Sequence, residues 1–176
     1  MSIKLDSLEK LLIAELKDLY SAEQQLIEAL PKVAKAAEDR ELRKALQDHL
    51  DVTRRQAKRI EQIFERWDEV PTGKKCKGME GLVKEGDDLV KEKEEKEADA
   101  DVIDAALIGA AQRVEHYEIS AYGTARAFAE RLGYADIASM LQESLEEERM
   151  ADELLSKLAV NNINRQAIAD NGKVRR

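Results

Sequence analysis

Ionisable side chains occupy four positions at which helices of this sequence would bury apolar residues: Glu23, His49, Glu118 and Glu148. At 100° per residue, each of them lies on the apolar stripe of its own segment. An ionised carboxylate in a dry core costs several kcal/mol, so it must be paired, neutralised or bound to a cation. No Lys or Arg lies on these stripes near the four positions. Because carboxylate and imidazole ligands suit iron, manganese or zinc, the pattern predicts a metal site.

The turn at Gly133 sets the relative heights of two of these residues. Glu118 lies 15 residues before Gly133, and Glu148 lies 15 residues after it. An antiparallel helical hairpin therefore brings both carboxylates to the same level. Two further acidic residues lie about one helical turn from this pair and are additional candidate ligands: Glu115 and Asp152.

The sequence does not determine the register of the first hairpin. Glu23 and His49 are level if the turn between their helices centres near Ala36. If the turn centres near Asp39, the two residues are offset by about 9 Å along the helix axis. In that case Glu23 faces one of two other polar residues: Thr53 or Gln56.

The same residues also admit an interpretation without a metal, in which hydrogen bonds satisfy the buried groups. Thr53 and Gln56 continue the face of His49 and could satisfy its ring. Three tyrosines could donate hydroxyl groups to nearby carboxylates: Tyr20, Tyr117 and Tyr122.

Four segments with a 3.6-residue apolar period predict the helices that carry these residues, over about residues 6–37, 41–68, 101–131 and 135–159. Pro31 predicts a kink or a break in the first helix. Asp39 is a plausible cap for the second helix, and Gly133 predicts a left-handed residue after the third. The long connection between the second and third helices begins as a turn-rich loop. From Met79 it predicts a short helix with a heavily charged end.

Two antiparallel hairpins joined by one long crossover are the connectivity of a ferritin-like bundle. We therefore predict an all-α fold, a ferritin-like four-helix bundle with a short fifth helix in the crossover connection. The bundle is predicted to cover residues 1–165, and residues 166–176 are predicted to form a flexible basic tail.

Composition and charge exclude several classes of protein. The 176 residues carry 37 Asp and Glu against 29 Lys and Arg, a net charge of −8, which argues against nucleic-acid binding. The N-terminus lacks the features of a signal peptide, and no apolar run is long enough to span a membrane, so we expect a cytoplasmic protein. Cys76 is the only cysteine, which rules out an intramolecular disulfide. Neighbouring lysines could lower its pKa, but an inert loop cysteine is the favoured interpretation.

Several motifs closely resemble the YciE/YciF-like family of bacterial stress proteins: "DLYSAEQQL", "QRVEHYEISAYGTARAFAERLGY", "LEEERMADELL" and "AVNNINRQA". The resemblance extends over about residues 3–167. That family belongs to the ferritin-like superfamily and is similar in fold to rubrerythrin. The resemblance implies a homodimer and a role in stress responses.

The wider superfamily carries one Glu on helix one and a Glu-x-x-His on helix two, and repeats this arrangement on helices three and four. The resemblance implies that four residues match ligand positions: Glu23, His49, Glu118 and Glu148. Leu46 stands three residues before His49 in place of the family's Glu, and Ala151 stands three residues after Glu148 in place of its His. The "EHYE" segment gives a Glu-x-x-Glu that is similar to rubrerythrin. The usual six ligands are therefore short by two unless two acidic residues take their place: Glu115 and Asp152.

Two functions are compatible with this set of residues. In the first, a stress-response protein binds one or two ions of iron or manganese, as a di-iron site if two, with redox or peroxide-related activity. In the second, a non-catalytic dimeric structural or interaction protein retains a vestigial metal site. The acidic balance disfavours a nucleic-acid-protecting assembly. The sequence leaves open whether the protein is an enzyme, and it identifies no substrate.

Overall fold

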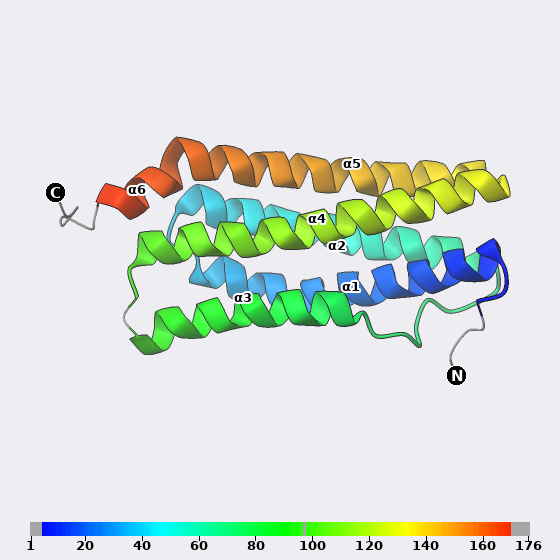
Figure 1. The fold of residues 1–176 in the computed structure, drawn as a ribbon, viewed down its shortest axis with the longest axis horizontal. Helices are drawn as coiled ribbons and strands as arrows, with labels where there is room; N and C mark the ends of the chain where they lie inside the picture. The colour runs from blue at the N-terminus through cyan, green and yellow to red at the C-terminus, as the bar shows by residue number, and fades with distance from the viewer. Residues whose placement is uncertain (1–4, 97, 170–176) are drawn as a thin grey trace.

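The computed structural model describes residues 5–96 and 98–169, and these residues form an all-helical fold (Figure 1). The predicted all-α class is confirmed. In chain order the elements are α1 (Leu8–Ala36), α2 (Arg40–Glu65), α3 (Lys77–Lys96), α4 (Ala100–Leu132), α5 (Ala135–Leu158), a π-helical turn η1 (Ala159–Ile163) and α6 (Asn164–Ala169).

The helix ends follow the local chemistry of the sequence. Asp39 caps α2 as predicted, since its side chain accepts hydrogen bonds from the backbone N–H groups of Glu41 at 2.8 Å and Leu42 at 2.9 Å. Gly133 ends α4 with a φ of 82°, the left-handed conformation predicted for it. Helix α1 continues through the exposed Pro31 without the break that was one of the two expected outcomes.

The four long helices pack in pairs. Helix α1 lies against α2 and α4, and α5 lies against α4 and α2 (Figure 1). Asp104 of α4 fixes the α1–α2 turn, because its buried carboxylate accepts hydrogen bonds from the backbone N–H groups of Glu38 at 3.0 Å and Asp39 at 2.6 Å. The register between the two hairpins is therefore held at this end.

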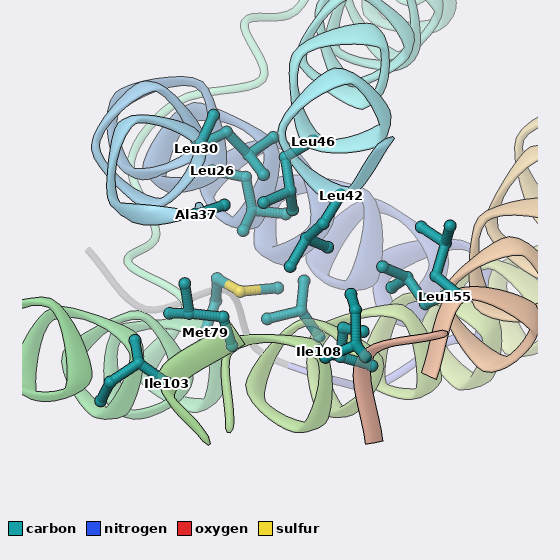
Figure 2. Close-up of a cluster of buried hydrophobic side chains, with 14 of the residues drawn as sticks. Leu26, Leu30, Ala37, Leu42, Leu46, Met79, Ile103, Ile108 and Leu155 are labelled. Atoms are coloured by element: carbon teal, nitrogen blue, oxygen red, sulfur yellow. The ribbon is translucent and has the colours of Figure 1, made fainter. Parts of the chain in front are cut away.

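Buried apolar side chains of the described residues form two clusters at different levels of the fold. One cluster contains Leu26 and Leu46 and reaches Met79 and Leu155 (Figure 2). The other contains residues such as Leu16, Ile60, Tyr122 and Leu141. On each of α1, α2, α4 and α5, the residues of one cluster precede those of the other, and four buried ionisable residues lie between the clusters: His49, Glu115, Glu118 and Glu148. Glu23 directly follows Ala22 of the cluster that contains Leu26, and Asp104 lies within that cluster.

Helix α3 is longer than the short crossover helix that we predicted, with 20 residues over Lys77–Lys96. Its charged C-terminal half continues the helix, because Glu and Lys are good helix formers and one side of the helix stays solvated. Helix α3 packs against α1 and α4. Contact with α4 is close at Gly78, where a Cβ atom would lie 2.7 Å from the Tyr117 ring.

The chain continues as helix past the predicted boundary at residue 165. Ile163 of η1 is buried, and the side-chain amide of Asn162 donates a hydrogen bond of 3.0 Å to Asp39 Oδ2 beside the α1–α2 turn. Helix α6 includes residues 166–169 of the predicted tail, and residues 170–176 lie outside the described residues. Among the described residues, no helix combines the length and the apolar character that crossing a membrane requires.

Candidate metal centre

Four side chains from α2, α4 and α5 converge between the two apolar clusters: His49, Glu115, Glu118 and Glu148. One potential ligand atom from each residue lies within 4.8 Å of the others. His49 Nε2 is 3.5 Å from Glu115 Oε1 and 3.7 Å from Glu148 Oε2. His49 is 8% exposed and Glu115 is 3% exposed, whereas Glu118 and Glu148 are completely buried. We call these four residues the carboxylate–histidine cluster.

Helix α1 contributes Glu23, which is completely buried but is not part of the group of four. The Tyr122 hydroxyl donates a hydrogen bond to Glu23 Oε1. This contact is one of the tyrosine–carboxylate pairs that the sequence suggested. The other two pairs lie elsewhere: Tyr20 donates to Glu61 and Tyr117 donates to Asp18.

The α1–α2 turn explains why His49 pairs with Glu115 and not with Glu23. Helix α1 ends at Ala36 and α2 begins at Arg40, so the turn centres on residue 38. This register is close to the second of the two predicted alternatives and puts Thr53 opposite Glu23. His49 is displaced along the helix axis toward the first residue of the "EHYE" segment, Glu115, whose carboxylate lies beside it.

Neutral hydrogen bonds satisfy only part of the cluster. The side-chain amide of Gln56 donates a hydrogen bond to Glu148 Oε1 and not to the His49 ring. The Thr53 hydroxyl donates to the His49 backbone carbonyl at 2.9 Å and leaves the imidazole unaffected. The interpretation without a metal therefore accounts for one oxygen of Glu148 and one of Glu23.

Several buried atoms of the cluster have no hydrogen-bond partner among the described residues: His49 Nε2, Glu115 Oε2, both carboxylate oxygens of Glu118, and Glu148 Oε2. Glu23 Oε2 is likewise without one. Buried polar groups are normally paired, so a set of unpaired atoms on side chains that converge fits a cation. An imidazole and three carboxylates are also ligands that iron and manganese accept.

Burial and the mutual proximity of the carboxylates also determine the pKa values of these side chains. Burial raises the pKa of Glu118 well above its usual range, and the charges of Glu23 and Glu148 raise it further. Burial likewise raises the pKa of Glu115, followed by the close approach and the charge of Glu148. For Glu23, burial and then the charge of Glu148 raise the pKa, against the Tyr122 hydrogen bond. Without a cation, Glu23, Glu115 and Glu118 therefore favour the protonated form.

Arg59 is a positively charged residue near the site, and the apolar stripes of the helices did not predict its position. The Arg59 side chain is 13% exposed, and its charge lowers the pKa of Glu23 as a lesser effect than burial. Its guanidinium is engaged at 2.6 Å by Glu147 and also by Glu143. Arg59 therefore forms salt bridges with carboxylates of α5 at the edge of the site. The apolar stripe could not reveal it, because a long side chain reaches inward from a neighbouring face.

Asp152, the last of the predicted ligands, lies outside the group of four. Its Oδ1 accepts a 2.9 Å hydrogen bond from Gln112, and its Oδ2 lies 3.3 Å from Nε2 of the exposed His116. Its charge still reaches the site, since it contributes to the raised pKa of Glu115.

Cys76 lies in the loop directly before α3, and its side chain is completely buried. Its sulfur lies 2.9 Å from the Tyr117 hydroxyl, which donates to Asp18 Oδ2 at 2.7 Å. Burial raises the pKa of the thiol, followed by the hydrogen bond with Asp18, so the lowering by nearby lysines does not occur. Lys74 and Lys75 instead pair with acidic residues, Asp18 and Glu80.

A family profile described as "Domain of unknown function (DUF892)" matches residues 7–168. The chain belongs to the DUF892 family. Protein YciF of Escherichia coli strain K12 is 43% identical over 166 residues, covering 94% of this chain and 98% of YciF. The resemblance to YciE/YciF-like stress proteins is therefore confirmed.

Solved structures also resemble this DUF892 chain. The crystal structure of the E. coli stress protein YciF matches with a TM-score of 0.84 at 43% identity, over 91% of this chain and 99% of that chain. YcfI from Rhodopseudomonas palustris matches with a TM-score of 0.81 at 42% identity, over 89% of this chain and 97% of its own. A Xanthomonas campestris protein at 19% identity has a TM-score of 0.69 over 92% of this chain and 99% of that chain and shares the fold.

Apolar residues of this DUF892 chain line the space beside the cluster at both positions where the sequence departs from the ligand pattern that the resemblance implied: Leu46 and Ala151. Leu46 borders two cavities that reach His49 and Glu115, and Ala151 borders one of them. Glu115 stands beside His49 and supplies the third carboxylate of the group.

Proposed function

We propose that this protein binds a transition-metal ion, iron or manganese, through His49, Glu115, Glu118 and Glu148, and acts in a stress response. The observation that carries the proposal is the convergence of three buried carboxylates and one imidazole, each of which has a buried atom without a hydrogen-bond partner among the described residues. When bound, such an ion would supply oxidation and reduction of peroxide or oxygen. The stress role is supported by the E. coli relative, whose structure is described as that of a stress protein.

The protein's own groups perform three tasks in this proposal. The cluster residues bind the ion, with the carboxylates compensating its charge. Gln56 orients Glu148 through the hydrogen bond to Oε1, and this bond leaves Oε2 free. The two apolar clusters exclude bulk water from either side. The group of four suits one ion, and Glu23 with its free Oε2 is the residue available for a second.

We also propose the finer fold assignment, a ferritin-like four-helix bundle in which α1–α2 and α4–α5 are the two hairpins. The pairwise packing of these helices and the crossover through α3 support it. The family resemblance supports a homodimer, which sedimentation velocity on the purified chain would test.

A non-catalytic structural role is the second candidate. It is favoured by Leu46 and Ala151, which stand where the superfamily carries ligands, and by the R. palustris relative, provisionally described as a structural protein. The two candidates differ in metal content.

Metal analysis of protein purified without chelators tests the proposal. We expect about one iron or manganese per chain, and an increase in melting temperature when either ion is added to chelator-treated protein. Glu148→Gln should lose most of this metal. The matched control is Glu146→Gln on the same helix, whose exposed side chain accepts a hydrogen bond from Gln142, and it should retain the metal. Less than about 0.2 metal per chain without uptake, or equal loss in both variants, supports the structural role instead.

A further inference from the structure

A cavity of about 40 Å³ lies between α1, α2, α3 and α4 and ends at the carboxylate–histidine cluster. Leu26 and Leu30 border it from α1, and Leu46 borders it from α2, where Figure 2 shows these three side chains gathered. Helix α3 contributes Val83 and Gly86 to the wall of the cavity. The crossover helix therefore borders a space that leads to the site.

The walls of this cavity are apolar. Among the described residues that line it, all are apolar or glycine except His49 and Glu115. A water molecule needs two to four polar partners to be held firmly, and these walls provide partners only at the cluster end. An ion would lose its hydration without compensation along the rest of the cavity. The lining thus favours an uncharged, weakly polar occupant.

The volume limits the occupant to a small molecule. About 10–15 Å³ accommodates one water molecule by the same measure, so this cavity has room for about three waters or one diatomic molecule. Gly86 supports the presence of free space, because it is buried and a Cβ atom built on it meets nothing within 4 Å.

The two polar lining residues, His49 and Glu115, indicate what the cavity could do. His49 and Glu115 are more than nine-tenths buried, and both His49 Nε2 and Glu115 Oε2 lack hydrogen-bond partners. The same two residues border a second, smaller cavity of about 20 Å³ between α2, α4 and α5, with Ala45, Ala151 and Leu154. His49 and Glu115 thus meet apolar space on two sides, whereas Glu23, Glu118 and Glu148 are completely enclosed.

We infer that the larger cavity is a binding site for a small uncharged molecule of two or three heavy atoms, held against His49 and Glu115. The inference rests on the proposed function only for what the molecule meets at the cavity's end, since apolar walls and free volume bind such a molecule without a metal. Helix α3 determines the size of the site, with Gly86 as the residue whose small size keeps it open.

Xenon is the probe for the test, because apolar cavities bind it without specific contacts. Xenon-129 NMR and xenon-pressurised crystals of the full chain should show one site between Leu46 and Gly86. Gly86→Leu should weaken xenon binding by about tenfold or more, because the new side chain fills the space. Gly81→Leu is the matched control: Gly81 is an exposed glycine of the same helix with open space around it, so xenon binding should be unchanged.

Three further measurements keep the outcomes separate. If Gly86→Leu does not fold, Gly86→Ala adds a single methyl group and should still lower xenon affinity. Azide, an anion of similar size, should not displace xenon from chelator-treated protein. Absence of the xenon site, equal effects at Gly81 and Gly86, or displacement by azide would each overturn the inference. Metal content is measured on the same samples, so a chain that binds xenon but no metal refutes only the proposed function.

Discussion

His49 of α2 and Glu115 of α4 face each other between the two helices, with 3.5 Å between His49 Nε2 and Glu115 Oε1. This pairing follows from the turn at residues 37–39 and from the Asp104 hydrogen bonds that hold the turn. Because three more carboxylates lie around the pair without a neutralising cation at the centre, protons and metal ions should compete for the same oxygens. The first prediction depends on that competition.

Stability of the metal-free protein should decrease as the pH rises. Glu23, Glu115 and Glu118 have folded-state pKa values raised well above their ordinary 4.5, with burial as the first cause. Above pH 4.5 the unfolded chain releases protons that the folded chain retains, so each pH increase through the raised values favours unfolding. Urea midpoints in chelator at pH 5 and pH 8 measure this, and the midpoint at pH 8 should be lower.

Added manganese should reverse the trend, because metal binding requires ionised carboxylates and strengthens as protons leave. Asp18 has a lowered pKa, and its contribution to stability is lost only as the pH falls through values below its ordinary 3.8. It therefore does not affect the pH 5–8 window. A midpoint that rises with pH in chelator would contradict the prediction.

Glu118→Met should stabilise the metal-free protein. Both carboxylate oxygens of Glu118 are buried without hydrogen-bond partners among the described residues. Replacing such a group by an apolar side chain of similar length should raise the free energy of unfolding at pH 8 by about 1–4 kcal/mol. Urea denaturation in chelator measures the change. Glu146→Met, at an exposed position, serves as the control and should stay within about 0.5 kcal/mol. Destabilisation by Glu118→Met would mean that the carboxyl group has a structural role.

The apolar period and the capping residues were sufficient to predict the four long helices. The predicted ranges agree with α1, α2, α4 and α5 to within about three residues at each end. Burial of Glu23, His49, Glu118 and Glu148 also followed from their stripes and is confirmed, whereas their role as ligands stays a prediction.

Contacts between helices were harder to predict. A shift of two residues in the centre of a turn moves a partner by four residues, and the sequence does not determine that centre well enough to choose between Glu23 and Glu115 for His49. The hydrogen bond from Gln56 to Glu148 and the position of Arg59 depend on side-chain reach across helices, which a single helical stripe does not contain. The length of α3 was missed because its charged half has little apolar period.

Tyr122→Phe should destabilise the protein, because the Tyr122 hydroxyl is the hydrogen-bond donor to the buried Glu23. Losing a donor to a buried acceptor should cost about 1–3 kcal/mol of unfolding free energy, measured by urea denaturation in chelator. Tyr20→Phe removes a hydroxyl that donates to the exposed Glu61, so its effect should be smaller, below about 0.5 kcal/mol. Equal losses in the two variants would show that the Glu23 contact has no special importance.

Ala151→His should strengthen metal binding. Ala151 lies on α5 three residues after Glu148, and it borders the small cavity that His49 and Glu115 also border. An imidazole at this position can therefore reach the cluster and add a nitrogen ligand. Competition with a chelator of known affinity should show iron or manganese binding about tenfold tighter than in the unaltered chain. Arg149→His places the same side chain at an exposed position of α5 and should leave the affinity unchanged. If both variants bind metal like the unaltered chain, the ion does not lie beside His49 and Glu115.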